Sequence, residues 1–511
     1  MMNRTDKSIK NLLFAFLSQG VTVLLSFMLR TEMLRSLGIL PASLNSLFSD
    51  VISTLSLAEL GIGSAIVYNL YKPLAEGDEK KICQLMYLYK KAYMTIAAVT
   101  MAVGLALVPI IHLLIEKVDI SLGYLRIVYV LFVFQNSVSY LFSYKISLVQ
   151  ADQKQYVYTN INMVCRTVGS IALIIIMRVT KSYLPYLIGN ISLTIITNAI
   201  ASRAVDKRYP YLKDDASLPA EEKKQIFTNV KNIFVKQIAG KVVNSTDNIL
   251  ISKLVGTLMV GYCGNYTMIT NVFTTLADKV WDSTEASFGN LFVTADEEKK
   301  IQVLKRLTFI FFLFALLGGV GIFACIQSFI MIWLKSETYL ISEDMVFLYS
   351  LLLFTTITYR PLSSAMHMTG YFEIGRNISG VSAVVNLVVS IILGKIIGLP
   401  GIFIGTCCTY LIEITSKTYF LFNRYFKSSP VSYALLWIKM LAIFCADCGI
   451  VHVISQHISY GYILKFLILG AISVALAAVF VLVVFARSEE MDFVMYLINE
   501  YMGRLKNRNR D

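Results

Sequence analysis

Residues 304–334 of the chain, LKRLTFIFFLFALLGGVGIFACIQSFIMIWL, form a long apolar stretch. After Lys305 and Arg306, no charged side chain follows until Lys335. A helix needs about 20 mainly apolar residues to cross a hydrocarbon core of roughly 30 Å. The stretch therefore predicts a membrane-spanning helix, and segments of the same kind recur from one end of the sequence to the other.

The composition of the whole chain agrees with this prediction. Of its 511 residues, 56% are hydrophobic and 15% are charged, and the mean hydropathy is +0.65. Soluble domains carry about 45–50% apolar and about 25% charged residues, so a set of soluble domains is excluded. The cysteines lie mostly inside apolar segments, where we expect small packing residues and not a disulfide framework.

We expect an all-α integral membrane protein with about fourteen transmembrane helices. The expected spans are 9–30, 44–69, 92–115, 123–146, 157–178, 183–203, 228–253, 256–279, 304–334, 345–367, 377–396, 400–421, 435–456 and 463–486.

Basic residues indicate which ends of these spans face the cytoplasm. The net charge is +13, and most Lys and Arg residues, such as Lys80, Lys81 and Arg508, fall on one side if the N-terminus is cytoplasmic. The positive-inside rule therefore places both termini in the cytoplasm.

Nucleic acid is not expected as a partner, because nucleic-acid binding needs basic residues clustered on a soluble face. Arg4 and Lys7 precede a full-length apolar segment, so we expect a retained first span and not a cleaved signal peptide.

A polar loop near the middle of the chain suggests a division into two lobes. Predicted boundaries follow from this loop and from the span positions. They are an N-terminal six-helix lobe at 1–205, a cytoplasmic linker at 206–227, a C-terminal six-helix lobe at 228–425, two additional helices at 426–487 and a cytoplasmic tail at 488–511.

An internal repeat supports the two lobes. Shifts of 218 or 219 residues align Phe16 with Phe234, Gln19 with Gln237, Gly38 with Gly256, and DEKKI at 78–82 with EEKKI at 297–301. Because each lobe holds an even number of spans, both insert in the same orientation, which makes a parallel repeat. We expect the two lobes to face each other around a central cavity that opens alternately to each side.

The seventh expected span is unusually polar. It lies within residues 226–256, IFTNVKNIFVKQIAGKVVNSTDNILISKLVG. A charge at the bilayer centre costs roughly 2.5–3.5 kcal/mol, so such residues should face water or a partner. At 100° per residue, Lys236, Asn244 and Asp247 share one side. With Lys241, this side predicts a cationic cavity wall for an anionic group; local Lys–Asp pairing is the alternative.

Other charges interrupt the apolar spans. Arg166, in the fifth span, is suited to bidentate phosphate contact or to a structural ion pair. Asp50 and Glu59, in the second span, are candidates for proton or sodium sites or for counter-ions to Lys236, Lys241 or Arg166, and for Glu59 we favour the counter-ion. Asp247, in the seventh span, is a further candidate for binding a coupling cation or for a counter-ion. The repeat-matched Gln19 and Gln237 complete the candidate substrate contacts.

Several other patterns do not support a function. Cys445 and Cys448 form a CxxC in an apolar helix without a second ligand pair, so no metal site is expected. Glu413 and Lys417 stand four residues apart, as in a helical ion pair. Glycine-rich stretches such as LLGGVG indicate close helix packing. No catalytic constellation and no nucleotide-binding GxxxxGK[ST] occurs, so we expect a non-enzyme without a cofactor. The energy for transport would then come from an ion gradient such as H⁺ or Na⁺, from the membrane potential or from the substrate's own gradient.

Five stretches carry a resemblance to a known family. They are LAELGIGSAIVYNLYKPLAEGDEKKI (57–82), STDNILISKLVG (245–256), GYCGNYTMI (261–269), SFGNLFVTADEEKK (287–300) and GLPGIFIGT (398–406). Together they resemble the bacterial polysaccharide flippases of the multidrug/oligosaccharidyl-lipid/polysaccharide (MOP) exporter superfamily, whose fold is MATE-like.

This resemblance implies a protein of the bacterial inner membrane that moves an undecaprenyl-diphosphate-linked oligosaccharide to the outer leaflet for polymerisation. It also implies membrane lipids, a polysaccharide polymerase and glycosyltransferases as partners.

Three other functions are considered. A MATE-type cation antiporter should place carboxylates in its cavity, whereas this chain has lysines in span seven. The lipid II flippase shares the architecture. A membrane glycosyltransferase would need a large outer loop, which the sequence lacks.

Overall fold

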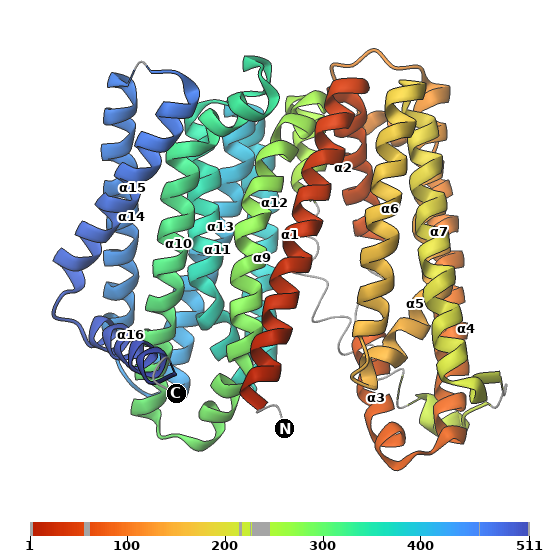
Figure 1. Cartoon of the computed structure of the whole chain (residues 1–511), viewed down its shortest axis with the longest axis horizontal. Coiled ribbons are helices and arrows are strands. Elements are labelled where there is room, and N and C mark those ends of the chain that lie inside the picture. The colour runs from red at the N-terminus through yellow and green to blue at the C-terminus, as the bar shows by residue number, and fades with distance from the viewer. Residues whose placement is uncertain are drawn as a thin grey trace. The chain divides into compact units, whose positions relative to one another are not determined.

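The computed structural model describes residues 4–55, 62–213, 217–224, 226, 246–458 and 460–508. This part of the chain consists of helices and connecting turns and contains no strand, which confirms the all-α prediction (Figure 1).

The chain forms two compact units, Met1–Gly261 and Tyr262–Asp511. The first contains α1 (Arg4–Ser36), α2 (Ile39–Leu55), α3 (Ile62–Glu76), α4 (Glu79–Ala106), α5 (Leu122–Ala151), α6 (Tyr156–Thr180) and α7 (Tyr183–Arg208). A long helix, α9 (Thr257–Thr294), begins at the end of the first unit and continues into the second. The second unit also contains α10 (Glu297–Leu334), α11 (Glu343–Met368), α12 (Phe372–Ile397), α13 (Leu399–Phe420), α14 (Val431–His457), α15 (Tyr462–Phe485) and α16 (Glu489–Arg508).

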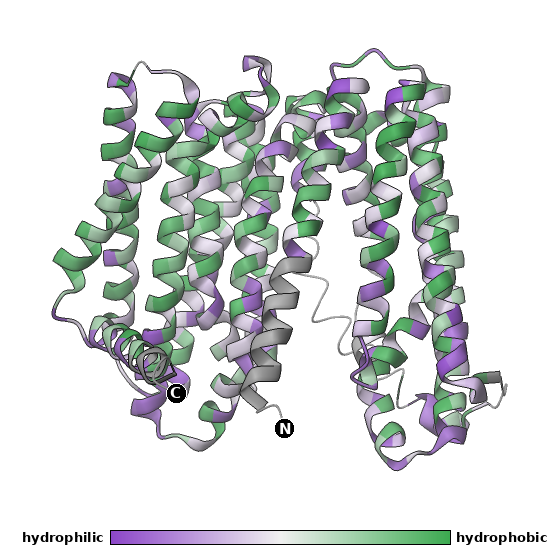
Figure 2. Ribbon diagram, in the orientation of Figure 1, coloured by the Kyte–Doolittle hydropathy of each residue, from purple (hydrophilic) through white to green (hydrophobic). Residues whose placement is uncertain are grey.

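The helices agree with the expected membrane spans. Nine helices in the described ranges are long and apolar enough to cross a membrane. Every expected span except 228–253 overlaps a described helix, and that span lies largely outside the described residues. Figure 2 shows apolar residues along the middle of most helices and polar residues gathered toward their ends. The chain is a multi-pass membrane protein.

Helix ends follow local capping and not hydropathy, as α4 shows. The expected span was 92–115, but α4 covers Glu79–Ala106. It begins early because the Asp78 carboxylate accepts a hydrogen bond of 2.9 Å from the backbone N–H of Lys81. It ends early because Pro109 disfavours helical geometry in the residue before it and offers no N–H of its own.

The stretch between the two predicted lobes packs against the first unit. Leu218 and Tyr209 are buried in a core cluster with residues of α4 and α5. The Cys83 thiol on α4 donates to the carbonyl oxygen of Tyr211 at 3.0 Å. The predicted linker at 206–227 therefore has an ordered part that covers one end of the first unit.

Close helix packing in the second unit depends on glycine. A Cβ at Gly319 of α10 would lie 2.8 Å from the Phe444 ring and 3.3 Å from the Ser350 carbonyl oxygen. This confirms the packing role predicted for LLGGVG. At the α12–α13 hairpin, a Cβ at Gly401 would overlap the backbone carbonyl of Leu393 and come within 2.7 Å of Gly394 N.

We expect Gly401→Ala to destabilise the second unit by about 1–3 kcal/mol, because backbone atoms cannot move aside as a side-chain end can. The matched control is Gly380→Ala on α12, where nothing lies within 4 Å of the added methyl group. That change should leave stability unaltered or raise it by up to about 1 kcal/mol through helix propensity. Thermal unfolding of the purified variants measures both, and equal melting temperatures would contradict the packing argument.

Candidate functional site

A polar cavity of about 550 Å³ lies inside the first unit, between α2, α5 and α7. Its lining side chains are mainly amides and hydroxyls, with aromatic rings at the edges. The polar residues are Asn45, Ser49 and Ser53 of α2, Gln135, Asn136, Ser139, Tyr140 and Ser143 of α5, and Tyr186, Asn190 and Thr194 of α7.

Helical periodicity explains why these residues meet. Along α2 the polar positions recur every four residues, at 45, 49 and 53, and along α7 they do so at 186, 190 and 194. On α5 the spacing is three and then four residues, at 136, 139 and 143. Residues three or four apart share one face of a helix, so each helix presents one polar stripe to the cavity.

Part of the polar lining bonds within the protein. Gln135 donates from Nε2 to the Thr194 hydroxyl at 3.0 Å, and Thr194 donates to the Asn190 carbonyl oxygen at 2.9 Å. The Ser143 hydroxyl donates to the Ser139 carbonyl oxygen at 3.1 Å. The Gln135–Thr194 bond links α5 to α7, and the other two bonds lie within α7 and α5. A hydroxyl that donates in this way still has lone pairs that can accept a hydrogen bond.

Other lining groups are open to a ligand. In the described part of the chain, the side chains of Asn45, Ser49 and Asn190 make no hydrogen bond. Each carboxamide offers two donors and one acceptor oxygen. None of the cavity's lining residues is charged. The site is therefore suited to a neutral ligand rich in hydroxyl groups, and it provides no counter-ion for an organic cation.

One candidate of the second span, Asp50, contacts a residue of the seventh expected span. Asn248, at the end of the seventh expected span, donates to the Asp50 carboxylate at 2.7 Å. Asp50 is the residue after Ser49 on α2, but it does not itself line the cavity. Asp247 is half-buried. The proton, sodium or counter-ion role of Asp50 and Asp247 stays a prediction.

Arg166 and Gln19 lie on other helices of the first unit. Arg166, on α6, is exposed and donates to the Ser26 hydroxyl of α1 at 3.2 Å. Gln19 is half-buried on α1. Neither residue lines the polar cavity. The remaining candidates, Lys236, Lys241, Asn244, Gln237 and Glu59, lie outside the described residues.

Two charged residues near the end of the first span escaped the sequence reasoning. Glu32 is 7% exposed and pairs with Arg178 of α6 at 2.9 Å. Arg30 donates to the carbonyl oxygen of Gly261 at 2.6 Å. Both contacts hold α1 to its neighbours. Their signal in the sequence is charge at the end of the first expected span, 9–30, whereas α1 continues to Ser36.

The second unit holds a buried polar cluster. Glu413 and Lys417 of α13 form the predicted ion pair, and their side chains are 8% and 4% exposed. The Tyr359 hydroxyl donates to the Glu413 carboxylate at 2.6 Å, and the Ser382 hydroxyl does so at 3.0 Å. The cluster links α11, α12 and α13, so its hydrogen bonds support a structural role.

Several solved structures are similar to this chain. No protein family profile and no curated protein sequence matches the chain. An inward-facing MATE multidrug-resistance transporter of the MOP superfamily is 13% identical, with a TM-score of 0.62, over 77% of this chain and 92% of that one. The lipid II flippase MurJ, in an inward closed conformation, is 15% identical, with a TM-score of 0.63, over 94% of this chain and 99% of that one.

A MATE transporter of Vibrio cholerae is 14% identical, with a TM-score of 0.56, over 80% of this chain and 95% of that one. The chain has the MATE-like fold. This confirms the predicted all-α, MATE-like fold class.

Proposed function

We propose that this MATE-like protein moves an undecaprenyl-diphosphate-linked oligosaccharide from the cytoplasmic to the outer leaflet of a bacterial inner membrane. The observation that carries the proposal is the cavity of the first unit, where uncharged amides and hydroxyls converge from α2, α5 and α7. Such groups form hydrogen bonds with sugar hydroxyls and provide no charge complementary to a cation.

The comparisons support a lipid-linked substrate over a soluble one. MurJ is a lipid II flippase, and its match spans 94% of this chain. The two MATE matches described above span 77% and 80%. An organic-cation antiporter, the second candidate function, would need a carboxylate in its binding cavity. Asp50, which follows Ser49 on α2 and is hydrogen-bonded to Asn248, is the residue that favours this alternative.

The remaining parts of the mechanism are also proposals. The cytoplasm-facing state would hold the diphosphate on Lys236, Lys241 and Arg166, and the sugars would bind the neutral cavity. An H⁺ or Na⁺ gradient would drive the cycle through Asp50 or Asp247. A polymerase on the outer face would consume the product, and glycosyltransferases on the inner face would supply the substrate.

A strain that lacks the gene tests the proposed function directly. We expect the complete undecaprenyl-diphosphate oligosaccharide to accumulate and the surface polysaccharide to disappear, because a charged sugar head does not cross hydrocarbon unaided. Mass spectrometry of extracted lipids measures the first and also identifies the sugars. Unchanged lipid intermediates together with new sensitivity to cationic drugs would instead establish the antiporter.

A further inference from the structure

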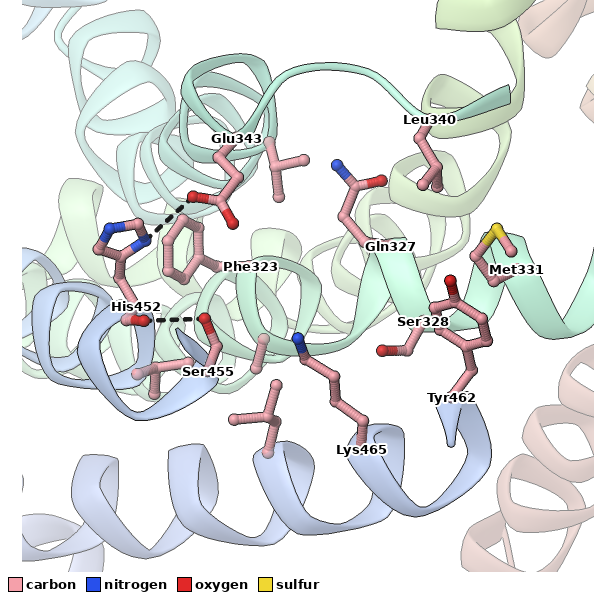
Figure 3. A pocket seen from close by; sticks show the side chains of 14 residues that line it. Phe323, Gln327, Ser328, Met331, Leu340, Glu343, His452, Ser455, Tyr462 and Lys465 are labelled. Atoms are coloured by element: carbon pink, nitrogen blue, oxygen red, sulfur yellow. Dashed lines mark hydrogen bonds and ion pairs between the residues drawn. The ribbon is translucent and has the colours of Figure 1, made fainter. Parts of the chain in front are cut away.

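A second polar pocket lies in the other unit, at the end of the bundle where α10 and α14 stop and α11 and α15 start. It has a volume of about 240 Å³ (Figure 3). A water molecule takes up about 30 Å³ of liquid, so the pocket has room for a polar group of several heavy atoms.

Three acidic or basic side chains line this pocket, Glu343, His452 and Lys465. His452 and Glu343 face each other, with their nitrogen and oxygen atoms 3.2 Å apart. Lys465, on the first turn of α15, points its ammonium group into the pocket (Figure 3). Within the described residues, no group forms an ion pair or a side-chain hydrogen bond with Lys465. The Lys465 ammonium group therefore has no carboxylate partner among these residues, because Glu343 contacts His452 instead.

Neutral donors surround this cation. Ser328 of α10 lines the pocket, is 4% exposed, and has no hydrogen-bond partner for its hydroxyl in the part of the chain that the structure describes. The first backbone N–H groups of α15 lie beside Lys465 and carry the positive end of the helix dipole. A buried, unpartnered hydroxyl beside an unpaired ammonium group is the arrangement expected for an anionic oxygen ligand.

An apolar groove continues from the pocket. It has a volume of about 540 Å³ and shares Met331 and Tyr462 with the polar pocket. Its other walls include Ile463, Leu464 and Leu467, whose side chains are 65%, 45% and 58% exposed on the outer face of α15. A helix that is this apolar on its outer face lies against lipid in a membrane protein.

We propose that the pocket and the groove together bind one phospholipid with a singly charged anionic headgroup. The phosphodiester contacts Lys465 and the Ser328 hydroxyl, and an acyl chain lies along Leu464 and Leu467. The phosphodiester provides the anionic partner that Lys465 lacks among the described residues. The site is in the second unit, outside the polar cavity of the first.

Native mass spectrometry of the full-length protein tests this site without a transport assay. Phosphatidylglycerol and phosphatidylcholine with identical acyl chains are titrated against wild type, Lys465→Gln and Lys439→Gln. Lys439 is the matched control because it is an exposed lysine on α14 that does not line either pocket. We expect wild type and Lys439→Gln to retain one phosphatidylglycerol, and Lys465→Gln to retain about tenfold less.

Three results would overturn the proposal. Equal retention of phosphatidylglycerol by Lys465→Gln and wild type would exclude the phosphodiester contact. If wild type retained phosphatidylcholine as well as it retains phosphatidylglycerol, selectivity for an anionic headgroup would be excluded. Displacement of the lipid by millimolar inorganic phosphate would show a site for a soluble anion. A Leu467→Asn variant with an unchanged melting temperature should also lose lipid, because its groove has become polar.

Discussion

Replacing Lys417 with methionine should lower the free energy of unfolding of the second unit by about 3–5 kcal/mol. The change removes the cation and leaves the Glu413 carboxylate buried with hydroxyl donors, among them Tyr359 and Ser382, and without a countercharge on Lys417. Breaking a buried ion pair from one side costs more than the pair contributes, because the remaining charge has lost both water and its partner. Thermal unfolding of the purified protein in detergent measures the loss.

The double variant Glu413→Gln/Lys417→Met provides the decisive comparison. It should be more stable than Lys417→Met alone, since neither charge is then left buried without a partner. An exposed pair with the same spacing, Lys72 and Glu76 at 3.8 Å, serves as the control. Lys72→Met should change stability by less than about 1 kcal/mol. If Lys417→Met unfolded at the wild-type temperature, the buried cluster would not stabilise the fold.

Replacing Asn45 or Asn190 with leucine should lower the transport rate of the lipid-linked oligosaccharide about tenfold. Each change removes an open carboxamide from the cavity, and a sugar hydroxyl that loses its partner there costs about 1–3 kcal/mol. A loss of about 1.4 kcal/mol corresponds to a factor of ten. The initial rate of flipping in proteoliposomes, at equal amounts of folded protein, measures the effect.

The control for the cavity variants is Asn499→Leu, because Asn499 is an exposed amide on α16, outside the membrane helices. It should transport at the wild-type rate. If Asn45→Leu and Asn190→Leu flipped the lipid-linked oligosaccharide at the wild-type rate, the cavity would not bind this substrate during transport. Loss of cation efflux with unchanged lipid flipping would assign the cavity to a drug substrate.

The predicted and observed sites differ because the sequence reasoning looked for charge. Charged residues in apolar spans are conspicuous, and Asp50, which follows the cavity residue Ser49, was found in this way. The neutral stripe of Asn136, Ser139 and Ser143 carries the same helical spacing, but serine and asparagine do not interrupt an apolar span strongly enough to stand out. A search for amides and hydroxyls at intervals of three and four residues would have found it.

The tail gives a second example. From Ser488 onward the sequence is polar on average, and we expected only a cytosolic extension. The structure forms α16 there, with Met491 buried and the Arg306 guanidinium 4.8 Å from the centre of the Phe493 ring. Average polarity hides an amphipathic helix, because such a helix needs apolar residues on one face only.

The sequence by itself determined the class of protein, the all-α fold and the approximate positions of the membrane helices. These follow from local properties, since the length of an apolar run and the cost of an unbonded backbone in lipid do not depend on distant residues. Only the tertiary structure decided that stripes on α2, α5 and α7 share one cavity, and that Ser328 and Lys465 line one pocket. Periodicity places residues on a face of one helix, but which faces meet depends on how the helices pack.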